Sequence, residues 1–108
     1  MITDYFSLEG KRALVTGAGK GIGARIATAF AEMGADVALI ARTQSDLDVV
    51  ASEVRTLGKE ALTFACDVTD ETALEGVVKE LTSNWGSLDI LINNAGAAGK
   101  GYGSLKKV

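Results

Sequence analysis

Val15-Thr16-Gly17-Ala18-Gly19-Lys20-Gly21-Ile22-Gly23 is the stretch of this sequence that decides its fold. A short run of β-favouring apolar residues lies before it, and apolar residues at helical spacing follow it, at positions 22, 26, 30 and 33. The stretch therefore predicts a glycine-rich turn that leads from a strand directly into a helix. Such a turn exposes the N–H groups and the positive end of the helix dipole, and it lets a pyrophosphate approach the backbone. We expect a nucleotide to bind here.

Further along the chain, apolar β-like runs alternate with amphipathic helical patterns. The strands are expected to begin near Arg12, Asp36, Ala61 and Leu88, with a repeat of about 25 residues. Alternating strands and helices imply right-handed crossovers, and therefore a parallel sheet with helices on both faces. The predicted fold class is α/β, with about four strands in the order 3-2-1-4.

Glycines and short polar residues mark the ends of the predicted helices. A glycine suits the left-handed position just past a helix end, and three glycines stand at such places: Gly34, Gly58 and Gly86. Thr43, with Asp46 three residues later, predicts the start of the second helix. Thr69 or Asp70 is expected to cap the third.

Composition excludes several classes of protein. The chain has 108 residues, 47% of them hydrophobic, which suffices for one domain. Its 11 basic and 14 acidic residues give a net charge of −3, so the basic excess that nucleic-acid binding demands is absent. The first ten residues do not resemble a signal peptide, and no run approaches the roughly 18 apolar residues of a membrane span. The lone Cys66 predicts a buried structural thiol, and a cytoplasmic location is the default.

The end of the second predicted strand bears on the choice of nucleotide. An acidic residue there would accept hydrogen bonds from an adenine-ribose 2′-hydroxyl, but the sequence has Arg42. Because a guanidinium has no acceptor and pairs well with phosphate, Arg42 favours NADP over NAD. Lys20 adds a second cation within the glycine turn. The alternative for both residues is a solvated surface charge.

Polar residues also follow the third and fourth predicted strands. Asp67 could accept hydrogen bonds from an adenine amino group, or it could help to cap the following helix. Asn93 and Asn94 could bond backbone groups between neighbouring strands, line a ribose site, or form an ordinary turn.

Three motifs together resemble a known family. The motifs are Thr16-Gly17-x-x-x-Gly21-Ile22-Gly23, Cys66-Asp67-Val68 and Asn93-Asn94-Ala95-Gly96. Their order and spacing resemble the N-terminal half of the short-chain dehydrogenase/reductase family. The lead-in Leu8-Glu9-Gly10-Lys11 is similar as well. The resemblance covers about residues 7–97 and is specific because three motifs agree at once.

This resemblance implies a Rossmann fold, a nicotinamide cofactor, and hydride transfer between that cofactor and an alcohol or carbonyl compound. It also assigns a role to each matching residue. The pyrophosphate would be wrapped by Gly17, Gly21, Ile22 and Gly23, and the 2′-phosphate would be held by Lys20 and Arg42. The adenine would contact Asp67 and Val68, and the ribose would be edged by Asn94, Ala95 and Gly96.

The resemblance assigns no catalytic residue to this chain. Family members are longer and carry their catalytic serine and Tyr-x-x-x-Lys pair in the second half, so the chain is expected to be an NADP-binding part that is inactive alone. Tyr102-Gly103-Ser104-Leu105-Lys106 matches the pair by spelling only. The glycines around it oppose the helix that would bring both side chains to one face. We expect a Rossmann half-domain over residues 1–96 and an irregular Gly/Lys-rich tail over 97–108.

Two other functions are compatible with parts of the pattern. One is a non-catalytic nucleotide-binding or interaction module that associates with another chain, including a second copy, through the exposed edge of the fourth strand. The other is a methyltransferase-type Rossmann domain, which needs an acid after the second strand, and Arg42 counts against it.

Overall fold

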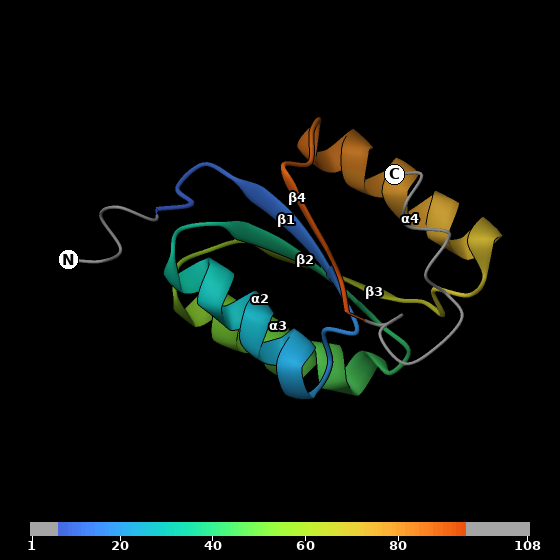
Figure 1. Cartoon of the computed structure of the whole chain (residues 1–108), viewed down its shortest axis with the longest axis horizontal. Helices are drawn as coiled ribbons and strands as arrows, with labels where there is room; N and C mark the ends of the chain where they lie inside the picture. Colours follow the sequence, from blue (N-terminus) through green and yellow to red (C-terminus); the bar gives the residue numbers. More distant parts are fainter. Residues whose placement is uncertain (1–6, 95–108) are drawn as a thin grey trace.

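The computed structural model describes residues 7–94 and has a parallel sheet between two layers of helix (Figure 1). The elements in chain order are β1 (Arg12–Thr16), α2 (Gly21–Glu32), β2 (Asp36–Ala41), α3 (Gln44–Thr56), β3 (Ala61–Ala65), α4 (Glu71–Trp85) and β4 (Ile90–Asn93). The strand order is β3-β2-β1-β4, which confirms the predicted α/β class and order. The boundary predicted at residues 96 and 97, and the tail beyond it, lie outside the described residues.

The two central strands are almost completely buried. In β1, Val15 is aligned with Leu39 of β2 on one side and with Ile92 of β4 on the other. Both faces of the sheet are covered, so these strands are near-continuous apolar runs rather than alternating ones. The central strands therefore form a rigid base for the loops at their carboxyl ends.

The sheet separates two hydrophobic clusters. One lies beneath α2 and α3 and includes Val15, Leu39 and Leu47. The other lies beneath α4 and includes Leu14, Ile40 and Trp85. Figure 1 shows α2 and α3 together on one side of the sheet and α4 alone on the other.

The buried face of α2 differs from the apolar stripe that predicted the helix. Its buried residues are small: Gly23, Ala27 and Ala31. Ile26 and Phe30 are partly buried and pack against the first cluster, whereas Ile22 is 70% exposed. Small residues on the inner face allow α2 to lie close against the sheet and the preceding turn, so the larger side chains lie at the sides of this face or in solvent.

The helix ends follow the glycines, while the caps differ from one helix to another. Backbone φ is positive at each of the three predicted stop positions, Gly34, Gly58 and Gly86. Asp70 caps α4, since its side chain accepts a hydrogen bond from the Ala73 N–H at 3.1 Å. Thr43 occupies the corresponding position of α3 but makes no side-chain cap bond.

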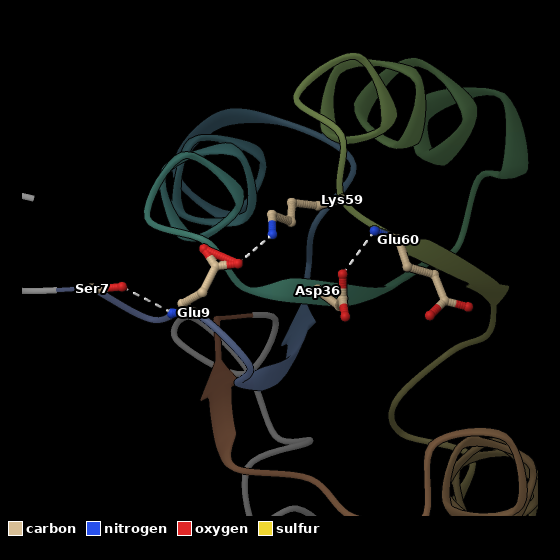
Figure 2. A network of polar contacts seen from close by, with 5 residues as sticks. All are labelled: Ser7, Glu9, Asp36, Lys59 and Glu60. Atoms are coloured by element: carbon tan, nitrogen blue, oxygen red, sulfur yellow. Dashed lines mark hydrogen bonds and ion pairs between the residues drawn. The ribbon is translucent and has the colours of Figure 1, made fainter.

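A polar network joins the amino-terminal ends of the strands (Figure 2). The Lys59 ammonium lies 2.7 Å from Oε1 of Glu9, and the Glu60 N–H donates to the Asp36 carboxylate at 2.8 Å. The indole N–H of Trp85 donates to the Glu60 carboxylate at 3.0 Å. These contacts join the loops before β1 and β3 and the first residue of β2 to the end of α4, so they stabilise this end of the sheet.

None of the helices in the described part of the chain combines the length and apolar character that crossing a bilayer requires.

Candidate nucleotide-binding site

The glycine turn lies at the carboxyl end of β1 and packs closely against the start of α2. Backbone φ is +63° at Gly17 and +57° at Gly21, a region that side chains disfavour. A Cβ atom on Gly23 would lie 2.0 Å from the carbonyl oxygen of Gly17 and 2.9 Å from Nδ2 of Asn94. Only glycine therefore fits at position 23 in this turn, as the motif requires.

The amino terminus of α2 is open to an anion. Lys20 occupies the N-cap position in extended conformation, but its side chain makes no cap bond, and the first turn holds no acidic residue. The first N–H groups of a helix have no partner within the helix, and the dipole there is positive. The turn and helix start thus fit a pyrophosphate, which would supply the missing acceptors.

The position of the turn within the sheet supports the same use. The chain passes along one face of the sheet through α2 and α3, and it reaches β4 through α4 on the other face. The strand order reverses between β1 and β4, and the glycine turn follows β1 at that point. Open α/β sheets bind ligands in the crevice beyond such a reversal.

Thr16, which the sequence analysis did not select as a site residue, joins the ends of β1 and β4. It is completely buried, and its hydroxyl accepts a hydrogen bond from the Asn94 N–H at 3.0 Å. The same hydroxyl lies 3.4 Å from the Ile92 carbonyl and 3.3 Å from Oδ1 of Asn93. The available signal was a hydroxyl residue at the end of an apolar buried strand, where a partner is obligatory.

Asn94 reaches across to the glycine turn. Its side-chain amide donates to the Gly17 carbonyl at 3.4 Å, which is the backbone-bonding alternative of the sequence analysis. Asn94 therefore connects the end of β4 to the turn and holds the carbonyl that excludes a side chain at Gly23. Ala95 and Gly96 lie outside the described residues, so their assignment to the ribose stays a prediction.

The glycine turn also contacts the carboxyl end of β2. The Ala18 N–H donates to the Ile40 carbonyl at 3.0 Å, and a Cβ atom on Gly19 would lie 3.3 Å from Cβ of Ala41. Lys20 follows Gly19 and Arg42 follows Ala41, so two cationic residues lie on neighbouring segments of the backbone. Both are exposed at this edge.

Asp67 follows β3 at the same edge and closes a local turn. Its Oδ1 accepts hydrogen bonds from the N–H of Thr69 at 2.9 Å and from the Thr69 hydroxyl at 2.7 Å. These bonds, the backbone one first, hold the pKa of Asp67 below its ordinary value, and the charge of Arg42 lowers it further. The cap of α4 itself is Asp70, so the Asp67 side chain organises the turn before the helix.

The neighbours of Asp67 face the interior. The Val68 side chain is packed in the cluster beneath α4, so an adenine would meet its backbone rather than its side chain. Cys66 is buried, as predicted, and burial raises the pKa of its thiol, with Asp70 and Asp67 adding to the shift. The thiol is therefore protonated at neutral pH and is a structural group.

A parallel sheet, a glycine turn at an open helix start, and polar residues after the strands together define a Rossmann-type nucleotide-binding domain. The family model described as short chain dehydrogenase matches residues 11–107. The chain belongs to this family of oxidoreductases, the short-chain dehydrogenases/reductases.

Two curated relatives show how much of a family member the chain represents. An uncharacterized oxidoreductase of Mycobacterium tuberculosis is 44% identical over 96 residues, which are 89% of this chain and 36% of the relative. A cyclohexanol dehydrogenase of a Rhodococcus species is 43% identical over 107 residues, with 88% of this chain and 40% of the relative covered. The chain thus spans well under half the length of these relatives.

Solved structures agree with the fold and differ in cofactor. A hydroxysteroid dehydrogenase of Escherichia coli has a TM-score of 0.83 at 40% identity, over 90% of this chain and 41% of its own. A metagenomic short-chain oxidoreductase in complex with NADP has a TM-score of 0.79 at 40% identity, over 83% and 41%. A carveol dehydrogenase of Mycobacterium avium in complex with NAD has a TM-score of 0.80 at 31% identity, over 86% and 38%. A nicotinamide cofactor is common to the family, and both of its forms occur among these solved relatives.

Proposed function

We propose that the chain binds NADP(H) in preference to NAD(H), as the cofactor-binding part of an oxidoreductase that transfers hydride between NADP(H) and an alcohol or carbonyl compound. The observation that carries the proposal is the contact between the glycine turn and the end of β2, where Gly19 meets Ala41. Lys20 and Arg42 follow these two residues directly, so their backbone positions are close together. An adenine-ribose 2′-phosphate would lie at this corner, which we define by Lys20, Arg42 and the residues beside them.

Different described residues would bind different parts of the cofactor. The N–H groups at the start of α2 bind the pyrophosphate, with Gly17 and Gly23 allowing its approach and Ile22 covering it from the exposed side. Asp67 offers its second carboxylate oxygen to an adenine amino group, since its bonds to Thr69 use Oδ1. Asn94 edges the ribose together with Ala95 and Gly96. The bound nicotinamide would supply the hydride carrier of the reaction.

The preference for the phosphorylated form follows from the residue after β2. An NAD-specific site of this fold needs a carboxylate at that place to accept bonds from the 2′-hydroxyl. Arg42 has five donors and no acceptor, so it leaves a 2′-hydroxyl without that partner and pairs with a 2′-phosphate. Solved relatives carry either cofactor, so family membership does not decide between the two forms and the proposed preference rests on Arg42 together with Lys20.

Catalysis is not assigned to any residue of this chain. Tyr102 and Lys106 lie outside the described residues, and we interpret their spacing as a coincidence. We propose that the proton-transferring residues belong to the part of a family member that this chain does not match, and that the chain alone is inactive. A cytoplasmic location stays a prediction.

Calorimetric titration of the full chain with NADPH and with NADH tests the proposal. We expect tighter binding of NADPH, and an Arg42→Asp substitution should reduce the ratio of the two affinities. Lys79→Asp, on the exposed side of α4, is the matched control because it makes the same change of charge away from the turn. Equal affinities in the unsubstituted chain, or a ratio that Arg42→Asp leaves unchanged, would contradict the assignment to NADP.

A second candidate function rests on the outer edge of β4. This strand pairs with β1 on one side, no other described strand pairs with its other side, and its four residues are only half-buried. An open apolar strand edge favours pairing with another chain. If the chain associates with itself there, sedimentation at several concentrations will show a dimer, and a monomer throughout would argue against this function.

A further inference from the structure

Asp46 lies in the first turn of α3, directly against the glycine turn. A Cβ atom on Gly19 would lie 2.9 Å from Cβ of Asp46. In the sequence analysis, this acid was used only to predict the start of the second helix. The fold instead brings its carboxylate beside the turn that we propose binds the cofactor.

The carboxylate of Asp46 faces a cation of the proposed site. Its Oδ2 lies 3.7 Å from the Lys20 ammonium, and this is the one ion pair that Lys20 makes within residues 7–94. The Lys20 side chain is 81% exposed, while that of Asp46 is only 30% exposed. The carboxylate of Asp46 is therefore largely covered by neighbouring groups, whereas the Lys20 ammonium lies mostly in solvent and can turn toward another anion.

The charges at this corner do not simply add up to two cations. Lys20 and Arg42 are positive and Asp46 is negative, so these three side chains together carry a net charge of +1. Asp67 is a second acid near Arg42, whose charge lowers the Asp67 pKa. A 2′-phosphate that binds the Lys20 ammonium therefore competes with Asp46 for its N–H donors and is repelled by the Asp46 carboxylate.

We propose that Asp46 is a specificity-determining residue that competes with the 2′-phosphate for Lys20 and so limits the preference for NADP(H) over NAD(H). This inference rests on the proposed function, because it concerns the 2′-phosphate corner of the same site. Asp46 acts through Lys20: it withholds part of the lysine's charge from the ligand. The opposite role, in which Asp46 improves binding by orienting Lys20, gains little, since exposed ion pairs order a lysine weakly.

Asp46→Asn is the direct test, because it removes the charge and keeps the Cβ atom that contacts Gly19. The probes are adenosine 2′,5′-bisphosphate and 5′-AMP, which differ at the 2′-phosphate and need no nicotinamide chemistry. Calorimetry should show about two- to fivefold tighter binding of the bisphosphate, the range expected for losing a competing exposed ion pair. Binding of 5′-AMP should stay within about twofold.

Asp48→Asn is the matched control for the change of charge. Asp48 stands two residues further along the same helix, is exposed, and accepts a hydrogen bond from the Gln44 amide at 2.8 Å. It takes part in no ion pair with Lys20. Its substitution should leave the affinities for both probes unchanged, and an equal gain with Asp48→Asn would reduce the Asp46 effect to general charge and overturn the proposal.

A double-substitution cycle tests whether Asp46 acts through Lys20. In a Lys20→Met background, Asp46→Asn should change the bisphosphate affinity less than it does in the unsubstituted chain. The same gain in both backgrounds, or weaker bisphosphate binding after Asp46→Asn alone, would overturn the inference. If instead the unsubstituted chain binds both probes equally, the proposed NADP function itself fails, so the two failures are distinguishable.

Discussion

The carbonyl oxygen of Gly17 lies 2.0 Å from the position that a Cβ atom on Gly23 would take. The start of α2 therefore touches the turn before it, backbone against backbone. Gly23→Ala must push these two segments apart, and such overpacking costs about 1–3 kcal/mol of unfolding free energy. Chemical denaturation measures this loss, and NADPH titration should show weakened binding because the helix start moves.

Gly76→Ala is the control for this substitution. Gly76 lies in α4, and a Cβ atom there would meet nothing within 4 Å. Alanine should raise the unfolding free energy by about 0.5–1 kcal/mol, because it restricts the unfolded chain and favours the helix. If Gly23→Ala were as well tolerated as Gly76→Ala, the contact between α2 and the turn would be wrong.

The N-terminal residues of α3 and α4 predict different losses of stability when each is replaced by alanine. Asp70→Ala removes a side-chain bond to the Ala73 N–H and should cost about 1 kcal/mol. Thr43→Ala removes no cap bond, so its cost should stay below about 0.5 kcal/mol. Thermal unfolding of both variants measures the difference, and equal losses would contradict the described geometry.

The turn after β3 predicts a titration. Thr69→Val removes the hydroxyl that donates to Asp67, so the lowered pKa of Asp67 should rise toward its ordinary value. A lowered carboxyl pKa stabilises the fold above the unfolded pKa, and this stabilisation is lost as the pH falls through the folded pKa. The stability deficit of the variant should therefore be present at neutral pH and fade in acid.

Carbon-detected NMR of the carboxyl groups follows the Asp67 pKa directly. Thr72→Val changes an exposed threonine in the first turn of α4 and serves as the control. An Asp67 titration that is identical in the Thr69→Val variant would show that the hydroxyl does not act on the carboxylate.

The network in Figure 2 predicts a change at alkaline pH. The hydrogen bond from Lys59 to Glu9 raises the pKa of the ammonium, with the charges of Glu9 and Asp36 adding to the shift. This stabilisation is present below the unfolded pKa of lysine and is lost as the pH rises through the folded pKa. Glu9→Gln should lower the Lys59 pKa, as seen by NMR of the lysine side chains, while Glu80→Gln on α4 should leave it unchanged. A Lys59 pKa that does not respond to Glu9 would refute the pairing.

Local pattern was enough to predict the fold. The apolar runs that start at Arg12, Asp36 and Ala61 begin strands at those residues, because consecutive apolar side chains need cover on both faces of a parallel sheet. The fourth strand begins at Ile90 instead of Leu88. Asp89, just before this strand, makes two hydrogen bonds with Arg12. Its N–H donates to the Arg12 carbonyl at 2.9 Å, and its carboxylate accepts from the Arg12 N–H at 2.9 Å.

The candidate site was only partly predictable. The glycine turn and Asn94 could be predicted because a motif carries local backbone geometry. The partners of Thr16 and Asp46 could not be predicted, since these partners lie far away in the sequence or on another loop, and only the folded arrangement brings them together. The assignments to adenine, ribose and 2′-phosphate stay predictions.

The unequal cover of the sheet sets the order in which parts of the molecule open. Within residues 7–94, α2 and α3 protect one face, while α4 is the one helix on the other face, where it packs through Leu74, Val77, Leu81 and Trp85. Segments with fewer buried contacts unfold locally at lower free energy. Amide hydrogen exchange should therefore be fastest in α4, intermediate in α3 and slowest in β1 and β2. The amide protons of β1, the strand that leads into the glycine turn, should exchange most slowly. The glycine turn would therefore stay anchored to a folded strand while α4 opens on the opposite face.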